Sequence, residues 1–286
     1  MICARHRDPA GICYPFCGRL TSANFIAKLL AGGHTVAAQV MTTIRHFVIA
    51  SVGLAVLASI ALAEAPAKLP SVDVILERNI KALGGEKAMR KLENREARGK
   101  IRLEAFGAEI PVVLRHAAPN KEAMELTIEG LGTVRDVFAG KKGWTETPDG
   151  RVIEKNEREL VNKKIDADFY AYLNFKKNYP KIELQGVEEV GGKKMFAVKM
   201  TPQKGDADTF YFDAATGLVT GIASAAEMQG REVKTRVFFR GYKTVDGVRI
   251  PHTLELKEPS FAAFTIRIKT VMHNVNDTAD WFRKTK

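Results

Sequence analysis

The sequence predicts a mainly β, α+β protein in which a curved antiparallel sheet forms an incomplete β-barrel wrapped around helix. Three observations predict this fold. One amphipathic helical stretch precedes the strands, apolar residues then recur with a period of two, and short turns separate these runs at regular spacing. Sequential strands joined by short turns favour an antiparallel meander, and a sheet this large curls instead of staying flat.

The first element of the domain is a predicted helix over residues 71–92. Ser71 has a side chain suited to capping the helix, and apolar residues follow it at helical spacing. Gly84 and Gly85 end a first piece, after which a short second piece continues to Leu92. We expect this helix to cover the apolar, concave side of the sheet.

Alternating apolar and polar residues mark twelve candidate stretches, from which we expect about ten or eleven strands. They fall into two groups, because a charged and glycine-free segment, 153–179, interrupts the alternation and is interpreted as one or two helices. The first group covers residues 101–105, 110–114, 124–128, 134–138 and 143–147. The second group covers residues 182–189, 195–201, 209–213, 218–228, 232–242, 248–256 and 264–273.

Residues 41–63 have the three-part pattern of a secretory signal peptide. A basic start with Arg45 precedes an uncharged apolar run of 17 residues, and Ala61-Leu62-Ala63 forms a small-x-small cleavage site at its end. The alternative is a membrane-spanning anchor, for which 17 residues lie at the low edge of the roughly 17–25 required. We predict cleavage after Ala63 and a mature protein in the periplasm or outside the cell.

The predicted cleavage divides the chain into three parts. Residues 1–40 hold all three cysteines and show no periodicity, so we interpret them as a disordered upstream extension. Cys13 and Cys17 have neither C-x-x-C spacing nor a second ligand pair, which argues against a redox or zinc site. Residues 64–286 then form a single domain without cysteines, which is long enough to bury its own core.

Several short motifs resemble those of exported LolA-like proteins, also called outer-membrane lipoprotein-sorting-like proteins. They are Leu83-Gly84-Gly85-Glu86-Lys87-Ala88, Ala118-Pro119-Asn120-Lys121, Ala139-Gly140-Lys141-Lys142-Gly143-Trp144, Tyr211-Phe212-Asp213 with Thr216-Gly217-Leu218, and Tyr242 with Val245-Asp246-Gly247-Val248-Arg249-Ile250-Pro251. The resemblance spans nearly all of residues 64–286. It implies an incomplete β-barrel closed by helices, with an apolar cavity that holds acyl chains.

Strand alternation identifies the residues that we expect to line such a cavity. Phe239, for example, takes the concave face of its strand, whereas the neighbouring Arg240 takes the other face. A long concave sheet has more apolar inner surface than one helix covers, so a ligand would fill the remainder. The candidate lining residues are Leu103, Leu114, Leu126, Phe210, Phe212, Val237, Phe239, Phe264 and Ile266.

Catalytic and metal-binding signals are few. The sequence has no H-E-x-x-H, G-x-S-x-G, Walker or dinucleotide-binding motif, and its domain histidines, His116, His252 and His273, fall on different strands. We therefore assign no catalytic residue, metal or cofactor. Burial of an acyl chain gains about 0.8 kcal/mol per methylene, which favours a carrier of a lipid or of lipoprotein acyl chains.

Two alternatives to the carrier remain open at this stage. The first is an envelope sensor or interaction module that binds a protein partner, and the second is an enzyme with its active site in the cavity. The formal net charge is +11 for the whole chain and +7 for residues 64–286, where basic and acidic residues are interspersed. This charge agrees with transient contact with an anionic membrane surface, whereas nucleic acid is not an expected partner outside the cell.

Overall fold

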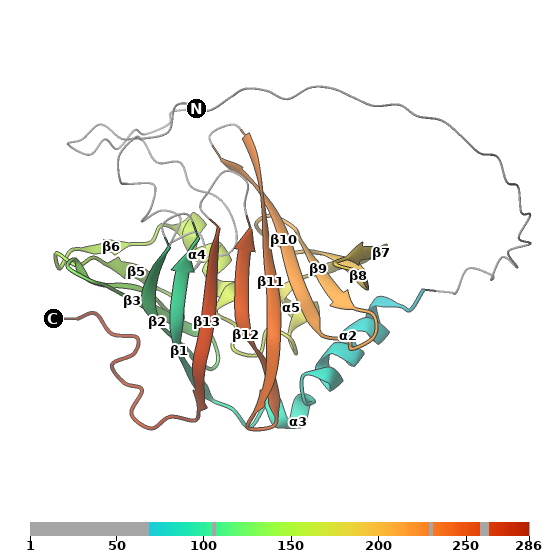
Figure 1. Cartoon of the computed structure of the whole chain (residues 1–286), viewed down its shortest axis with the longest axis horizontal. Helices are drawn as coiled ribbons and strands as arrows, with labels where there is room; N and C mark the ends of the chain where they lie inside the picture. The colour runs from blue at the N-terminus through green and yellow to red at the C-terminus, as the bar shows by residue number, and fades with distance from the viewer. Residues whose placement is uncertain (1–68, 105–106, 229–230, 258–262, 286) are drawn as a thin grey trace, which may run out of the picture.

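The strands of the domain form one continuous antiparallel sheet. The computed structural model describes residues 69–104, 107–228, 231–257 and 263–285. Within them, thirteen strands follow the order β6-β5-β4-β3-β2-β1-β13-β12-β11-β10-β9-β8-β7 (Figure 1). Strands that are consecutive in the chain pair with each other, except for β6 and β7, which lie at the two ends of the sheet, and the pairing of β1 with β13 joins the two halves. The predicted curved antiparallel sheet is confirmed, and the sheet is not closed into a barrel.

The strands extend beyond several of the predicted limits. The first half consists of β1 (Asn94–Leu103), β2 (Ala108–Ala117), β3 (Lys121–Ile128), β4 (Gly132–Ala139), β5 (Gly143–Glu146) and β6 (Val152–Glu154). The second half consists of β7 (Lys181–Val190), β8 (Lys193–Thr201), β9 (Asp208–Asp213), β10 (Val219–Met228), β11 (Arg231–Val245), β12 (Val248–Lys257) and β13 (Phe264–His273). The predicted strand number was too low, partly because β6 has three residues, too few to show a period.

The helices agree with the two helical regions that the sequence predicts. The first region forms α2 (Val72–Ala82), capped by the Ser71 side chain, and the short α3 (Glu86–Met89). The segment between the two groups of strands forms α4 (Glu157–Asp166) and α5 (Phe175–Asn178). Asn156 and Glu159 form a reciprocal capping box at the start of α4, which explains why a charged stretch begins a helix there.

Helix α2 is fixed to the sheet at turns that contain glycine. The backbone N–H of Arg249 donates to Leu83 O at 2.8 Å, so the end of α2 meets the turn between β11 and β12. Gly84 has φ +117°, and a Cβ built there would lie 2.1 Å from Gly247 O, so only glycine fits. The buried Asn79 amide donates to Gly217 O at 2.8 Å in the β9–β10 turn.

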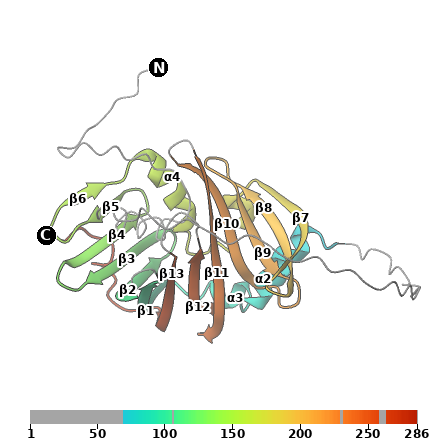
Figure 2. The ribbon, with the colours of Figure 1, turned by 45° about the horizontal axis from the view of Figure 1, so that its top comes forward.

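The concave face is covered by two segments rather than by the first helix alone. Ile75 and Leu76 of α2 pack against β8, β9 and β10, whereas the segment 157–179 lies over the rest of the inner face. Figure 2 shows the sheet curving from β6 to β7, with α4 between its two ends. The first helix covers part of the inner face, as expected, and the segment 157–179 is an additional cover, since one helix of 11 residues is too short for thirteen strands.

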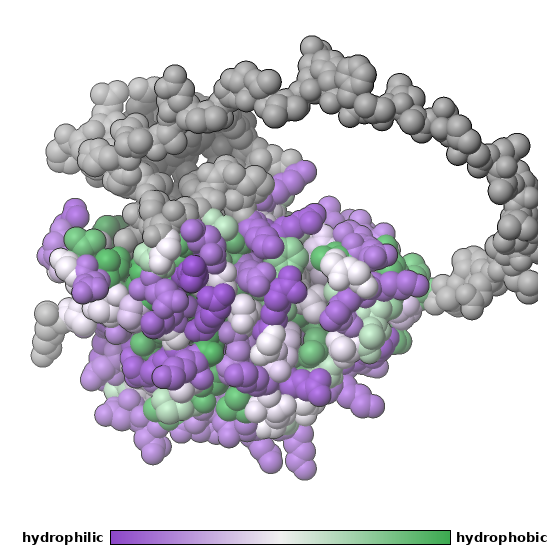
Figure 3. All heavy atoms as spheres, in the orientation of Figure 1, coloured by the Kyte–Doolittle hydropathy of each residue, from purple (hydrophilic) through white to green (hydrophobic). Residues whose placement is uncertain are grey.

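The outer side of the sheet is mostly polar, except where Ala123, Val137 and Trp144 of β3–β5 pack with Phe282 of the C-terminal segment. The side of the molecule seen in Figure 3 is mainly hydrophilic, with its hydrophobic residues scattered among charged ones. Exposed ion pairs, such as Arg102 with Glu104 at 3.5 Å, lie on the outer face of β1. No helix in the described part of the chain has the length and apolar character needed to cross a bilayer, and the predicted signal peptide lies outside that part.

Candidate ligand-binding cavity

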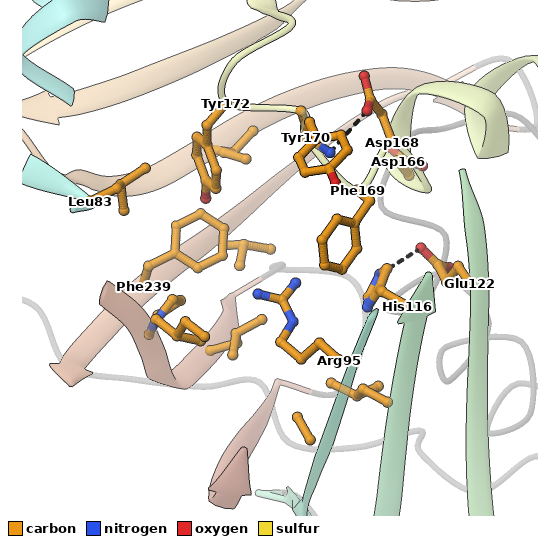
Figure 4. A pocket seen from close by; sticks show the side chains of 18 of the residues that line it. Leu83, Arg95, His116, Glu122, Asp166, Asp168, Phe169, Tyr170, Tyr172 and Phe239 are labelled. Atoms are coloured by element: carbon orange, nitrogen blue, oxygen red, sulfur yellow. Dashed lines mark hydrogen bonds and ion pairs between the residues drawn. The ribbon is translucent and has the colours of Figure 1, made fainter. Parts of the chain in front are cut away.

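A cavity of about 390 Å³ lies between the inner face of the sheet and the segment 165–179 (Figure 4). Its wall is mostly apolar and draws on both halves of the sheet, on the end of α2 and on the covering segment. The apolar lining comprises Leu83, Met89, Leu92, Ala97, Leu114, Ile165, Phe169, Tyr170, Ala171, Tyr172, Phe175, Tyr179, Phe210, Ile222, Val237, Phe239, Val248, Ile250, Pro251, Leu254, Leu256, Phe264, Ile266 and Ile268.

Six of the nine residues predicted from strand alternation lie in this wall, and three do not. Those in the wall are Leu114, Phe210, Val237, Phe239, Phe264 and Ile266. Leu103 and Leu126 are buried in an apolar cluster with Val112 and Met124, and Phe212 is buried against α2. Leu103, Leu126 and Phe212 lie on the inner face, but other side chains of the core pack directly against them, so they do not border the cavity. That the other six bind a ligand stays a prediction.

The segment 165–179, which covers the cavity, is held together by hydrogen bonds to the Asp168 carboxylate. Its carboxylate accepts hydrogen bonds from the backbone N–H of Tyr170 at 3.0 Å and from the Asn178 amide at 2.7 Å. The Asn174 amide donates to both carboxylate oxygens, at 3.1 and 2.9 Å. One side chain thus ties the loop after α4 to α5 and fixes the aromatic residues between them.

The same loop is also fastened to the sheet. The backbone N–H of Phe169 donates to Pro119 O at 3.0 Å, in the turn between β2 and β3. The Tyr170 hydroxyl donates to Leu92 O at 2.9 Å, in the segment that precedes β1. Both hydrogen bonds lie beside the start of β1, so they hold the covering segment in place over this end of the cavity. The sequence analysis missed these covering residues, although the aromatic run in 169–175 was visible.

Four polar residues form a row across the inner face of the sheet. Strand register places Glu122 on β3 beside His116 on β2, His116 beside Arg95 on β1, and Arg95 beside His273 on β13. Directly opposed side chains on one face lie about 4.5–5.5 Å apart at Cβ. Two of the three histidines that seemed unconnected in the sequence therefore flank one arginine.

Arg95 is the cationic group of this row that faces the cavity. In Figure 4 its guanidinium points into the space between Phe169 and Phe239, and its Cζ lies 5.9 Å from the centroid of the Phe169 ring. Among the described residues, no carboxylate or carbonyl accepts a hydrogen bond from this guanidinium, and burial lowers the pKa of Arg95. The sequence analysis missed Arg95, because a charge within a charged stretch is usually on a solvated face.

Tyr172 lies on the opposite side of the same space. Its hydroxyl points from the cover into the cavity, toward the side from which Arg95 projects (Figure 4). Burial raises the pKa of Tyr172, and the effect of the nearby Arg95 is smaller and opposite, so the phenol stays protonated. The cavity therefore contains a cation and a neutral O–H donor in a mostly apolar wall.

A buried ionic cluster beside the row holds α4 on the sheet. Lys163 of α4 pairs with Glu122 and, at 2.9 Å, with Asp136, and Lys155 reaches Asp136 at 2.6 Å. Burial alone would raise the pKa of Glu122, but Lys163 and His116 hold it well below its usual range. Burial alone would lower the pKa of Lys163, but the two carboxylates raise it. Glu122, Asp136 and Lys163 therefore remain charged at neutral pH.

The histidines do not gather at one site. The His116 ring lies 3.3 Å from Glu122, the His273 ring lies 2.8 Å from Asp246, and His252 contacts Ile250 O of its own strand at 3.0 Å. Across the described ranges, no three His, Cys, Asp or Glu side chains are grouped as metal ligands would be. The residues of the cavity can therefore bind an apolar ligand next to the positive charge of Arg95.

An open antiparallel sheet curved around an apolar cavity with a helical cover defines a half-barrel fold of the LolA type. Solved structures share it. A DUF1329 family protein from Desulfovibrio piger aligns with a TM-score of 0.54 and 13% identity, over 74% of this chain and 97% of that chain. A putative outer membrane lipoprotein-sorting protein domain from Vibrio parahaemolyticus gives 0.53 and 12%, over 73% and 97% of the two chains.

A LolA superfamily protein from Nitrosomonas europaea aligns equally well. Its TM-score is 0.52 at 11% identity, and the alignment covers 76% of this chain and 99% of that one. No family model matches the sequence, and no curated protein matches it. At these identities the similarity establishes the fold, and it agrees with the resemblance seen in the sequence motifs.

Proposed function

We propose that the protein is an exported carrier that binds a hydrophobic ligand, a lipid or the acyl part of a lipoprotein, in the cavity. The observation that carries the proposal is the cavity of about 390 Å³ with its mostly apolar wall. Its size lies within the roughly 300–1,000 Å³ typical of small-molecule sites. Transfer of an acyl chain from water into such a wall gains about 0.8 kcal/mol per methylene.

The comparisons support this proposal through the fold they share. One similar structure is described as a lipoprotein-sorting domain and another as a LolA superfamily protein. The signal-peptide pattern of residues 41–63 supports export to the periplasm or beyond. A carrier in that compartment would meet lipids released from membranes, and the net charge of +7 over residues 64–286 favours contact with anionic membrane surfaces.

The test is binding of the neutral fluorescent probe N-phenyl-1-naphthylamine to purified protein. Phe239→Asp should abolish binding or destabilise the fold, because it places a carboxylate among the apolar side chains of the wall. The matched control is Arg240→Asp on the same strand, where the side chain is exposed and paired with Glu255 at 3.2 Å. Equal and negligible effects of the two changes would contradict the proposal.

A sensor or interaction module is the second candidate, because β6 and β7 have no strand partner on their outer sides within the described residues. An exposed sheet edge can pair with an extended segment of another protein. Mass spectrometry of material that co-purifies with the protein separates the candidates. Acyl lipids favour the carrier, whereas a stoichiometric protein without lipid favours the interaction module.

A further inference from the structure

We propose that Arg95 and Tyr172 form a carboxylate-binding subsite inside the cavity, and that the ligand is a long-chain fatty acid with one acyl chain. This inference rests on the proposed function and specifies the class of ligand that the cavity takes. It places the polar end of the ligand in the interior, beside the row of polar residues that crosses β3, β2, β1 and β13, and the acyl chain along the apolar wall.

The first argument is the unpaired charge of Arg95. Arg95 is half-buried, and a cation withdrawn from water without a counter-ion is unfavourable, so proteins normally pair such groups. Here the guanidinium meets the face of the Phe169 ring, but no acid of the described residues bonds to it. A guanidinium offers parallel N–H donors that match the two oxygens of a carboxylate. A bound fatty acid would supply both the missing charge and the missing acceptors.

The second argument is that two acids of the wall, Glu122 and Asp168, are already engaged. Glu122 pairs with Lys163 and lies 3.3 Å from the His116 ring, and Asp168 accepts hydrogen bonds from Asn174 and others. Neither carboxylate therefore competes with a ligand for Arg95. The Tyr172 hydroxyl adds a neutral donor from the cover, so an anion between the two residues would be bound from both sides (Figure 4).

The third argument is the size and shape of the apolar space. From Arg95 the wall continues along β1 and β13 through Ala97, Ile268 and Ile266 to Phe264. Its volume of about 390 Å³ lies near the lower end of the roughly 300–1,000 Å³ range for ligand pockets. That space suits one acyl chain rather than several, which distinguishes a free fatty acid from a multi-chain lipid.

The experiment is displacement of N-phenyl-1-naphthylamine from the purified protein by myristic acid and by methyl myristate. We expect the acid to bind about 10- to 100-fold more tightly than the ester, as is typical of charge-assisted hydrogen bonds. Arg95→Met should remove this preference and keep ester binding. Tyr172→Phe should reduce the preference less, and it remains informative if Arg95→Met does not fold. Arg102→Met is the control, because Arg102 is on the same strand and its ion pair is exposed.

The outcomes separate the two proposals. If neither the probe nor the lipids bind, the proposed function fails. If the probe binds but acid and ester displace it equally, or if Arg95→Met and Tyr172→Phe both leave the preference intact, the carboxylate subsite is wrong. Tighter binding of a single-chain lysophosphatidic acid than of myristic acid would also overturn the assignment, since it would mean that the subsite recognises phosphate.

Discussion

Replacement of Lys163 by methionine tests how the cover is held on the sheet. The Lys163 side chain is 2% exposed, and its partners Glu122 and Asp136 are 6% and 1% exposed. Methionine has a similar volume but leaves two buried carboxylates without their shared cation. Removal of one partner from a buried ion pair destabilises a protein by about 3–5 kcal/mol.

The structure places the expected effect at the lower end of that range. Lys155 still reaches Asp136 at 2.6 Å, and His116 still lies 3.3 Å from Glu122, so each carboxylate keeps one contact. We therefore expect a loss of about 3 kcal/mol in the free energy of unfolding. In a domain of this size that corresponds to a fall in Tm of about 6–12 °C.

The assay is urea denaturation of both proteins between pH 7 and pH 4. Because the pKa of Glu122 is depressed in the folded state, its contribution is complete above its unfolded pKa of about 4.3 and is lost at lower pH. The raised pKa of Lys163 keeps its contribution complete throughout this range. The difference between the proteins should therefore stay at its full value from pH 7 down to about pH 4.3 and begin to shrink only below that pH. A Lys163→Met protein as stable as the exposed-site control Lys164→Met would refute the reasoning.

Other predictions concern the attachment of the first helix and the processing of the chain. Gly84→Ala should lower the free energy of unfolding by at least about 1–3 kcal/mol, since its φ is +117° and the new Cβ would clash with Gly247 O. Gly85→Ala should cost less, because nothing lies within 4 Å of its Cβ position; equal losses would contradict the clash. Secreted protein should begin at Glu64 on N-terminal sequencing, and an intact Met1 would contradict cleavage. A chain starting at Glu64 should melt cooperatively, and a requirement for residues 1–40 would contradict their exclusion from the domain.

The sequence predicts the sheet well because its strands have one apolar and one polar face. The alternation around Phe239 and Phe264 settles which side is inward, and both residues lie in the cavity wall. The alternation does not predict whether an inward-facing side chain borders the cavity or packs directly against a helix. Phe212 obeys the same pattern but is packed against α2, because the distance between layers depends on tertiary contacts.

The polar part of the site was beyond sequence analysis for a different reason. Arg95 lies among Asn94, Glu96 and Arg98, where the period of two is hidden by charge, so nothing marks it as inward-facing. Its neighbours His116 and His273 are 21 and 178 positions away in the chain, and only the register of β1 with β2 and β13 brings them together. Register between distant strands is set by the whole sheet and not by any local pattern.

The unclosed sheet has a consequence for the range of ligands. In a closed barrel the number of strands and their stagger fix the diameter, so the interior cannot change without breaking hydrogen bonds. Here the twelve strand pairings run in a single open series from β6 to β7. Small changes of twist at each pairing add up along the series and alter the curvature while every ladder stays intact. We expect the width of the interior to adapt to its contents, so that chains of different length and unsaturation are accepted by one wall.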